Sequence, residues 1–492
     1  MANFKLLARD TAIYGLSSII GRFLNYLLVP LYTYKISTDA YGTVTNLYAY
    51  TALLLVILTF GMETTFFRFA NKEGENPKLV FSTILRMVGA VGVVFLAGVF
   101  AFLGPLSGAM GYALHPSYVA VMAIIVALDA FQAILFSYLR YKQKAMRFAA
   151  LKLLFIFLSI GLNLLFFVGF PWLSGRWSLP LWLYDPSVGV GYIFYINLFC
   201  TAFVTLFFLR EIKGIFGGFD KALMRRMLGY SWPLLLLGVA GILNQTADKI
   251  LFPHIYPGSP EEVKAQLGIY GAASKIAMIM AMITQAFRYA YEPFVFGSSK
   301  EKDNLETYSK GMRYFLVFTL LAFLAVIAYL DILRYIIGPR FWEGLRVVPI
   351  VMAAEIMMGV YFNLSFWYKL TDKTLWGAVF AGTGCAVLVA VNLIFVPRFG
   401  YIACAWAGVA GYGTAMVLSY LVGQRYMKIN YQLPQLLVYV LLAALLFAGM
   451  QWSNAHLGLW AAMGVNTLLL GLFCVYMVWK DFRPLLNRFL RR

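Results

Sequence analysis

Long apolar stretches dominate the sequence, and each is about as long as the roughly 20 residues that a helix needs to cross a bilayer. About fourteen such stretches follow one another. They run over residues 11–34, 43–70, 79–103, 118–140, 149–170, 189–210, 229–253, 268–295, 312–337, 347–368, 375–396, 401–423, 433–452 and 457–479. Only 12% of the 492 residues are charged, about half the fraction typical of a soluble domain. The sequence therefore predicts an all-α polytopic membrane protein.

The distribution of lysine and arginine predicts the orientation of the chain. With the N-terminus in the cytoplasm, about 28 of the 40 Lys and Arg residues fall on the cytoplasmic side, about 7 outside and about 5 within spans. This asymmetry indicates that both termini are cytoplasmic. The same rule, with attraction to anionic lipid surfaces, explains most of the net charge of +19. We therefore expect membrane lipids as partners and no nucleic acid.

Two halves of the chain look alike. Matching features recur at a separation of roughly 223 to 229 residues, which suggests a six-span unit duplicated in parallel orientation. The matches are Pro30 with Pro253, Tyr41-Gly42 with Tyr270-Gly271, Glu63 with Glu292, Arg86 with Arg313, and Asp129 with Glu355. The predicted domains are an N-terminal six-helix lobe (1–210), a cytoplasmic amphipathic connector (211–228), a C-terminal six-helix lobe (229–424), and an extra helix pair with a basic cytoplasmic tail (425–492).

The motifs of conventional enzymes are absent from the sequence. It has no GxSxG, P-loop, HExxH or glycine-rich loop after a strand, so we predict neither enzymatic activity nor catalytic residues. The three histidines fall in separate predicted loops, and the four cysteines sit in apolar segments without CxxC spacing. We expect no metal site, no cofactor and structural roles for the cysteines.

Charged residues inside the predicted spans are the candidates for function, because a charge in hydrocarbon costs about 3 kcal/mol or more. Arg22 lies roughly 16 Å of helix rise from either end of the first span. It shares a polar helical face with Ser18 and Asn25. The other candidates are Glu63, Asp129, Asp248, Lys249, Lys275, Arg288 and Glu355.

Structural interpretations of these residues remain open. Arg22 and Asp129 are equally consistent with a buried ion pair that only stabilises the fold. Asp248 and Lys249 are adjacent and suit a local pair near the outer surface. The aromatic segment 172–184 suits a membrane-interface belt, with a sugar-stacking wall as the functional alternative.

Four segments resemble the polysaccharide transporter family of Wzx-like flippases, in the superfamily that also holds the lipid II flippase MurJ and the MATE drug exporters. These segments are AIYGLSSIIGRFLNYLLVPLYT, AYGTVTNLYAYTALLLVILTFGMETTFFRF, ILNQTADKILF and VPRFGYIACAW. The resemblance implies two six-helix lobes around a central cavity that opens alternately to each side. It also implies that the extra helix pair forms a groove for a prenyl tail.

The same resemblance implies a function in the bacterial inner membrane. It is the transfer of an undecaprenyl-diphosphate-linked oligosaccharide from the cytoplasmic to the periplasmic leaflet, coupled to H⁺ or Na⁺. The expected partners are this polyprenyl-diphosphate-linked glycan and the glycan polymerase or glycosyltransferase machinery. The alternatives are a MurJ-like lipid II flippase, a MATE-like exporter and, in a different class, an integral membrane glycan polymerase. A polymerase needs a larger outside loop than this sequence offers.

The substrate and the coupling ion call for different side chains. Cations suit a diphosphate, while amides suit sugar hydroxyls. We therefore predict substrate contacts from Arg22, Asn25, Asn244, Lys249, Lys275 and Arg288. Ion coupling or counter-ion roles are predicted for Asp129, Glu355, Asp248 and Glu63.

Replacing Arg22 tests its predicted role. Arg22→Ala should abolish glycan export while folded protein remains in the membrane, because a guanidinium grips a diphosphate through paired hydrogen bonds. Arg22→Lys should retain only part of the activity. If Arg22 has only a structural role, Arg22→Ala should instead lower protein abundance. The substitution would leave the carboxylate partner buried without a cation and destabilise the fold by about 3–5 kcal/mol. Membrane abundance measured beside surface-glycan output separates the two. Normal export by well-expressed Arg22→Ala contradicts the substrate role.

Overall fold

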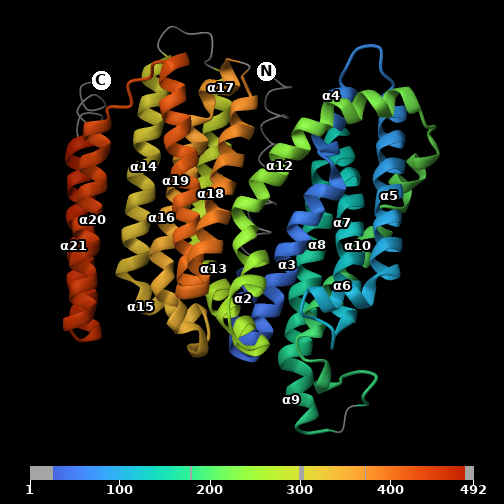
Figure 1. The fold of residues 1–492 in the computed structure, drawn as a ribbon, viewed down its shortest axis with the longest axis horizontal. Helices are drawn as coiled ribbons and strands as arrows, with labels where there is room; N and C mark the ends of the chain where they lie inside the picture. The colour runs from blue at the N-terminus through green and yellow to red at the C-terminus, as the bar shows by residue number, and fades with distance from the viewer. Residues whose placement is uncertain (1–25, 178–179, 298–303, 372, 483–492) are drawn as a thin grey trace. The chain divides into compact units, whose positions relative to one another are not determined.

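The computed structural model describes residues 26–177, 180–297, 304–371 and 373–482. Within these ranges the secondary structure is helical, without strands (Figure 1). Twelve helices are long and apolar enough to cross a membrane, or 13 with the bent pair Gly191–Leu206 and Leu209–Phe216. The predicted all-α polytopic class is confirmed. The predicted number of fourteen is not, because most of the first predicted span, 11–34, lies outside the described residues.

Contacts within the chain group it into two units, the first ending at Gly271 and the second beginning at Ala272. This division falls inside the helix Pro260–Gly297. The lobes predicted over 1–210 and 229–424 follow from the sequence repeat and stay a prediction. Each unit is described below by itself.

The first unit runs from α2 to the start of α13. Its elements are α2 (Leu28–Lys35), α3 (Thr38–Thr59), α4 (Met62–Ala70), α5 (Pro77–Ala101), α6 (Leu103–Ala109), α7 (Pro116–Tyr141), α8 (Ala145–Leu164), η1 (Leu165–Gly169), α9 (Phe170–Ser174), η2 (Pro186–Val188), α10 (Gly191–Leu206), α11 (Leu209–Ile212), η3 (Lys213–Phe216), α12 (Lys221–Ile255) and the start of α13 (Pro260–Gly297). Aromatic and aliphatic side chains of α4, α5 and α7 form much of its core.

Helix α12 joins the predicted connector to the seventh predicted span. It begins where the Asp220 carboxylate accepts hydrogen bonds from the amides of Ala222 and Leu223, a typical N-cap. It then continues without interruption to Ile255 although it contains Pro233, and prolines bend helices. Figure 1 shows α12 turning from one end of the first unit to run beside α3. Helix α12 therefore includes residues 221–228 of the predicted connector, whose placement at the cytoplasmic side stays a prediction.

Glycines bring α3 and the first part of α13 into backbone contact. A Cβ atom built on Gly42 would lie 1.8 Å from the Lys264 carbonyl oxygen, and one on Gly268 would lie 1.9 Å from the Thr38 carbonyl oxygen. Only glycine fits at both positions, as at other close crossings of membrane helices. This crossing places polar residues of α3 and α13 in one region.

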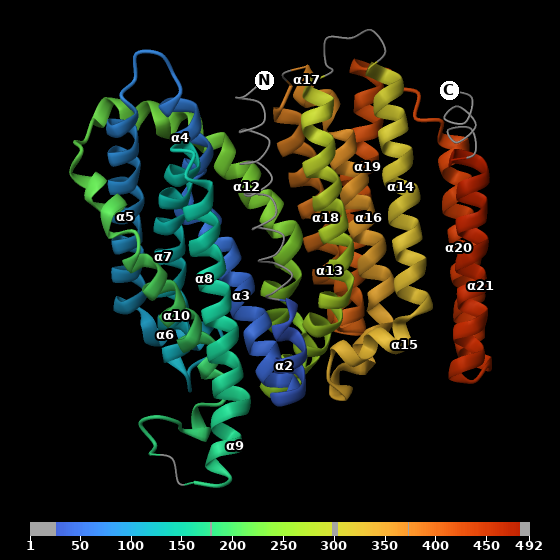
Figure 2. The ribbon, with the colours of Figure 1, turned by 180° about the vertical axis from the view of Figure 1, so that it is seen from behind.

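The second unit contains the rest of α13 and the helices that follow it. They are α14 (Asn304–Ala328), α15 (Leu330–Leu333), η4 (Arg334–Ile336), η5 (Pro339–Val347), α16 (Val348–Leu364), α17 (Phe366–Leu370), α18 (Leu375–Phe399), α19 (Tyr401–Tyr426), α20 (Leu433–His456), α21 (Leu459–Met477) and η6 (Val478–Phe482). The extra pair α20 and α21 lies beside α14 (Figure 2).

A buried ion pair attaches the extra pair to one end of α14. The Asp481 carboxylate in η6 pairs with the Arg313 guanidinium of α14 and accepts a hydrogen bond from the Tyr439 hydroxyl of α20. The side chain of Asp481 is only 3% exposed and that of Arg313 is 20% exposed. Asp481 therefore contacts α14 and α20 together.

Polar contacts also attach the extra pair to the other end of α14. The Asn466 amide of α21 donates to the Ala328 carbonyl, with 3.5 Å between nitrogen and oxygen. The hydroxyls of Thr467 and Tyr329 lie 3.2 Å apart. Lipid tails are as apolar as the side chains of these helices, so the hydrophobic effect does not hold membrane helices together. Polar contacts such as these therefore help to fix the position of α20 and α21 beside α14.

Arg313→Ala should destabilise the protein, because it leaves the Asp481 carboxylate buried without its cation. Removing one partner of a buried pair costs about 3–5 kcal/mol. Lys310→Ala is the matched control. It removes another cation of α14, whose pair with Glu306 is 58% and 67% exposed, and such exposed pairs contribute about 1 kcal/mol or less. Thermal unfolding of the purified variants measures both effects. Equal melting temperatures would show that Asp481 does not anchor the extra pair.

Candidate functional site

Asp248 and Lys249 form a hydrogen-bonded polar cluster in the first unit. The buried Asp248 carboxylate accepts hydrogen bonds from the Tyr270 hydroxyl at 2.6 Å and from the Lys249 ammonium at 3.0 Å. The Lys249 ammonium also donates to the Gln245 carbonyl at 2.9 Å. The charges of Asp248 and Lys249 thus neutralise each other within α12, and the ammonium is already occupied by local acceptors.

The cluster extends across the glycine crossing to α3. The Asn46 amide donates to the Lys249 carbonyl at 2.8 Å, and its oxygen accepts from the Tyr112 hydroxyl at 2.8 Å. Both Asn46 and Tyr112 are buried. Hydrogen bonds made this far from water hold α3, α12 and the α6–α7 connection in fixed relative positions.

Glu63 is paired with a cation of a neighbouring helix. Its carboxylate accepts hydrogen bonds from Arg140 at 3.0 Å and from Ser137 at 3.2 Å, both on α7. The Arg140 and Glu63 side chains are 37% and 43% exposed. The structure thus gives Glu63 a local counter-ion. Its coupling role stays a prediction.

Asp129 lies half-buried on α7 and interacts electrostatically with Lys152 of α8. The Lys152 ammonium lies 4.0 Å from the centroid of the Phe136 ring and also interacts with Glu63 and Arg140. One turn from Asp129, the Gln132 amide donates to Thr201 and Thr205 of α10. Two acidic and two basic side chains therefore form a charge cluster across α4, α7 and α8.

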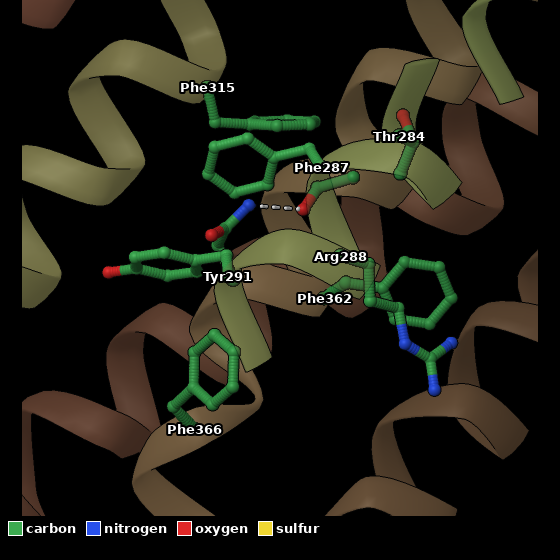
Figure 3. A pocket seen from close by; sticks show the side chains of 9 residues that line it. Thr284, Phe287, Arg288, Tyr291, Phe315, Phe362 and Phe366 are labelled. Carbon is green, nitrogen blue, oxygen red and sulfur yellow. Dashed lines mark hydrogen bonds between the residues drawn. The ribbon is translucent and has the colours of Figure 1, made fainter. Parts of the chain in front are cut away.

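Arg288 lies at an aromatic cluster in the second unit. Its guanidinium carbon lies 5.0 Å from the centroid of the Phe362 ring, a cation–π distance. Figure 3 shows Phe287, Phe315 and Tyr291 gathered on one side and the guanidinium directed away from them. Arg288 therefore places its hydrophobic stem against the rings and its charge at their edge.

The cavity beside Arg288 is closed in this conformation. It holds about 10 Å³, roughly the room of one water molecule. Gly359 allows this closure, since a Cβ atom there would lie 2.1 Å from the Phe315 ring. A diphosphate does not fit between these rings unless they separate.

The remaining predicted residues are distributed over both units. Asn244 is buried on α12 and donates to the Ala240 carbonyl at 2.9 Å. Lys275 is half-buried on α13, on the same helix as Arg288, and Glu355 is half-buried on α16, one turn before Gly359. Arg22 and Asn25 lie outside the described residues. Their proposed roles stay predictions.

Two charged residues of these clusters were missed from the sequence. Lys152 was overlooked although it interrupts the apolar run AALKLLFIF, seven residues into α8. Asp481 lies just after the last apolar stretch, in the segment that the sequence predicts to be a basic tail. The described residues contain no group of three or more His, Cys, Asp or Glu side chains that could hold a metal ion.

Comparison with known families identifies the chain. The family described as polysaccharide biosynthesis protein matches residues 7–290, more than half of the sequence. The chain belongs to this family. A curated relative of this chain is Lsg locus protein 1 of Haemophilus influenzae. It is 22% identical over 344 residues, which cover 68% of this chain and 77% of the relative.

Solved structures show the same fold. The lipid II flippase MurJ in an inward closed conformation matches with a TM-score of 0.67 and 15% identity, over 94% of this chain and 98% of its own. An inward-facing multidrug resistance MATE transporter matches with a TM-score of 0.64 and 13% identity, over 82% of this chain and 93% of its own. The predicted resemblance to a polysaccharide family is confirmed by the family match, and the solved structures share the fold of the chain.

Replacing both charges of the α12 pair separates a structural role from a substrate role. The double variant Asp248→Asn/Lys249→Gln should keep most glycan export, because Asp248 already neutralises the Lys249 charge. The single variant Lys249→Gln is the control, and it should be less stable than the double variant because it leaves the carboxylate without a cation. Membrane abundance and surface glycan are measured for both. An abundant double variant without export would show that Lys249 binds the substrate.

Proposed function

We propose that the protein moves an undecaprenyl-diphosphate-linked oligosaccharide from the cytoplasmic to the periplasmic leaflet of the bacterial inner membrane. Family membership carries this proposal. A fold likeness to MurJ over nearly the whole chain supports a lipid-linked substrate. Both termini face the cytoplasm in this proposal, as the lysine and arginine asymmetry predicts.

The substrate's headgroup explains why cations belong inside this protein. A diphosphate is anionic and cannot cross hydrocarbon alone, so the transporter must offer compensating charge at low dielectric. Lys249 is bonded to Asp248 in the described structure. Arg288 and Lys275 of α13 are the other cationic candidates among the described residues, and Arg22 is a candidate outside them. Arginine suits the role because its planar fork binds phosphate oxygens in pairs.

In this proposal, the aromatic rings beside Arg288 separate when the diphosphate headgroup binds. Phe287, Phe315 and Tyr291 occupy the space beside Arg288. A headgroup that separates these rings would reach the guanidinium, which lies at their edge. Binding would then favour a conformation other than the closed one, as alternating access requires.

For energy coupling we propose Asp129 and Glu355, which occupy matching positions in the sequence repeat. Asp129 interacts with Lys152, so a proton or Na⁺ arriving at its carboxylate would change the charge balance of the whole cluster. The same change at Glu355 would act in the second unit. The Asp129→Asn variant should lose transport driven by an imposed pH gradient. Proteoliposomes that contain the variant measure this.

A transport assay with purified protein tests the function and the role of Arg288 together. Proteoliposomes carry a fluorescent polyprenyl-diphosphate oligosaccharide, and a membrane-impermeant reagent measures its movement between leaflets. Wild type should move it. Arg288→Ala should reduce the rate at least about tenfold, the effect of losing a charge-assisted pair, and Arg288→Lys should recover part of it. Arg425→Ala, which removes an exposed arginine from the last turn of α19, should leave the rate unchanged.

Other outcomes contradict the proposal. Movement of lipid II alone would identify a cell-wall flippase, and export of an organic cation alone would identify a MATE-like exporter. Elongation of the glycan would indicate a polymerase. An unchanged rate in Arg288→Ala would remove this arginine from the substrate path.

A further inference from the structure

A cavity of about 270 Å³ in the first unit includes Pro171 of α9 in its lining. Figures 1 and 2 show that α9 projects beyond the other helices of this unit. The lining of the cavity comes from the end of α2, from η1 and α9, from the loop that joins α9 to α10, and from the start of α10. The cavity volume is many times the roughly 10–15 Å³ that a cavity needs to hold one water molecule. It offers room for one sugar ring.

Two parallel tyrosines form one wall of this cavity, which we call the α9 cavity. The rings of Tyr184 and Tyr192 stack with centroids 5.7 Å apart and an angle of 14°. The centroid of the Phe166 ring lies 4.7 Å from that of the Tyr192 ring. The face of an aromatic ring carries partial negative charge, so it attracts the polarised C–H groups on one face of a pyranose.

A change of helix type places neighbouring phenylalanines in the same lining. Helix α8 ends in η1, a π-helical turn over Leu165–Gly169, and such turns recur at functional sites. Phe166 contacts Tyr192, while Phe167 packs against Tyr32 with centroids 5.8 Å apart. Adjacent residues of this turn thus connect the cavity to both the loop and α2.

Hydrogen bonds fix the loop that carries Tyr184. The Tyr192 hydroxyl accepts from the Asp185 amide at 2.7 Å and donates to the Asp185 carbonyl at 3.1 Å. Hydrogen bonds from the hydroxyl and the amide of Ser187 lower the pKa of Asp185, which begins η2 as an ionised cap. Gly189, with φ +51°, completes the turn in a region that favours glycine. The wall is therefore preformed.

A single charged side chain, Lys35 at the end of α2, is among the residues that line the α9 cavity. A cation beside a stacking wall suits a sugar that carries a carboxylate. The tryptophans of the same segment behave differently, since Trp172, Trp177 and Trp182 are 57%, 73% and 84% exposed. They suit the membrane-interface belt, whereas the tyrosines line the cavity.

We propose that the α9 cavity is a binding site for one acidic pyranose residue of the transported glycan. This inference rests on the proposed function and deepens it by naming an acidic sugar as part of the substrate. With both termini in the cytoplasm, the cavity faces the periplasm, where it would hold the glycan as it leaves the transporter. Stacking on Tyr184 and Tyr192 supplies affinity for the ring, and Lys35 selects the carboxylate.

Saturation-transfer NMR with the full-length protein in nanodiscs tests this site. The probes are glucuronic acid, glucose and glycerol 1-phosphate. Glucuronic acid should receive saturation on its ring protons and bind more tightly than glucose. Tyr184→Ala should weaken binding at least about tenfold, the order of effect when a stacking ring is lost, while Tyr184→Phe should retain it. Trp182→Ala, an exposed aromatic of the same loop, should bind as wild type does.

A second measurement tests whether Lys35 makes the site prefer an acidic sugar to a neutral one. Lys35→Gln should reduce glucuronic acid binding to the level of glucose and leave glucose unaffected. The site is disproved if neither sugar binds wild type, if Tyr184→Ala binds normally, or if glycerol 1-phosphate binds more tightly than both sugars. This last result would make the cavity a lipid-headgroup site. Sugar binding without lipid transport in proteoliposomes would refute the proposed function alone, and transport without sugar binding would refute this site alone.

Discussion

The cost of a charge in hydrocarbon is the constraint on which the interior of both units depends. An isolated ion there costs about 3 kcal/mol or more, and four of the carboxylates that interact with cations illustrate how the described residues meet this cost. Asp248 pairs with Lys249 within α12, Glu63 with Arg140 between α4 and α7, and Asp481 with Arg313 between η6 and α14. Asp129 interacts with Lys152 between α7 and α8. Three of the four connect different elements, so these pairs also fix the packing of helices.

Pairing also limits which charges can serve a substrate. A cation that already binds a carboxylate exchanges one partner for another when a phosphate arrives, and so contributes little net attraction. This separates Lys249, enclosed by Asp248 and the Gln245 carbonyl, from Arg288, which lies over an aromatic face. An aromatic ring stabilises a guanidinium without neutralising it.

The hydrophobic pattern predicted the fold class well, because bilayer thickness alone sets the length of each span. Pairings across helices were harder to predict. Asp248 and Lys249 are adjacent in sequence, and their pair was anticipated. Lys152 and Asp129 are 23 residues apart on different helices, and Arg313 and Asp481 are separated by most of the second unit, so periodicity could not reveal either contact. Small residues were equally uninformative: Gly42 and Gly268 carry no sign in the sequence that their helices touch.

The polar attachment of α20 and α21 limits how such a chain can be shortened. Between Gln432 and Trp479 the extra pair has no charged residue, and lipid could solvate most of its surface. Arg313, however, belongs to α14 and has its carboxylate partner in η6. A protein that lost the extra pair would keep an orphaned guanidinium on α14. Removing these two helices would therefore call for a neutral side chain at position 313 as well.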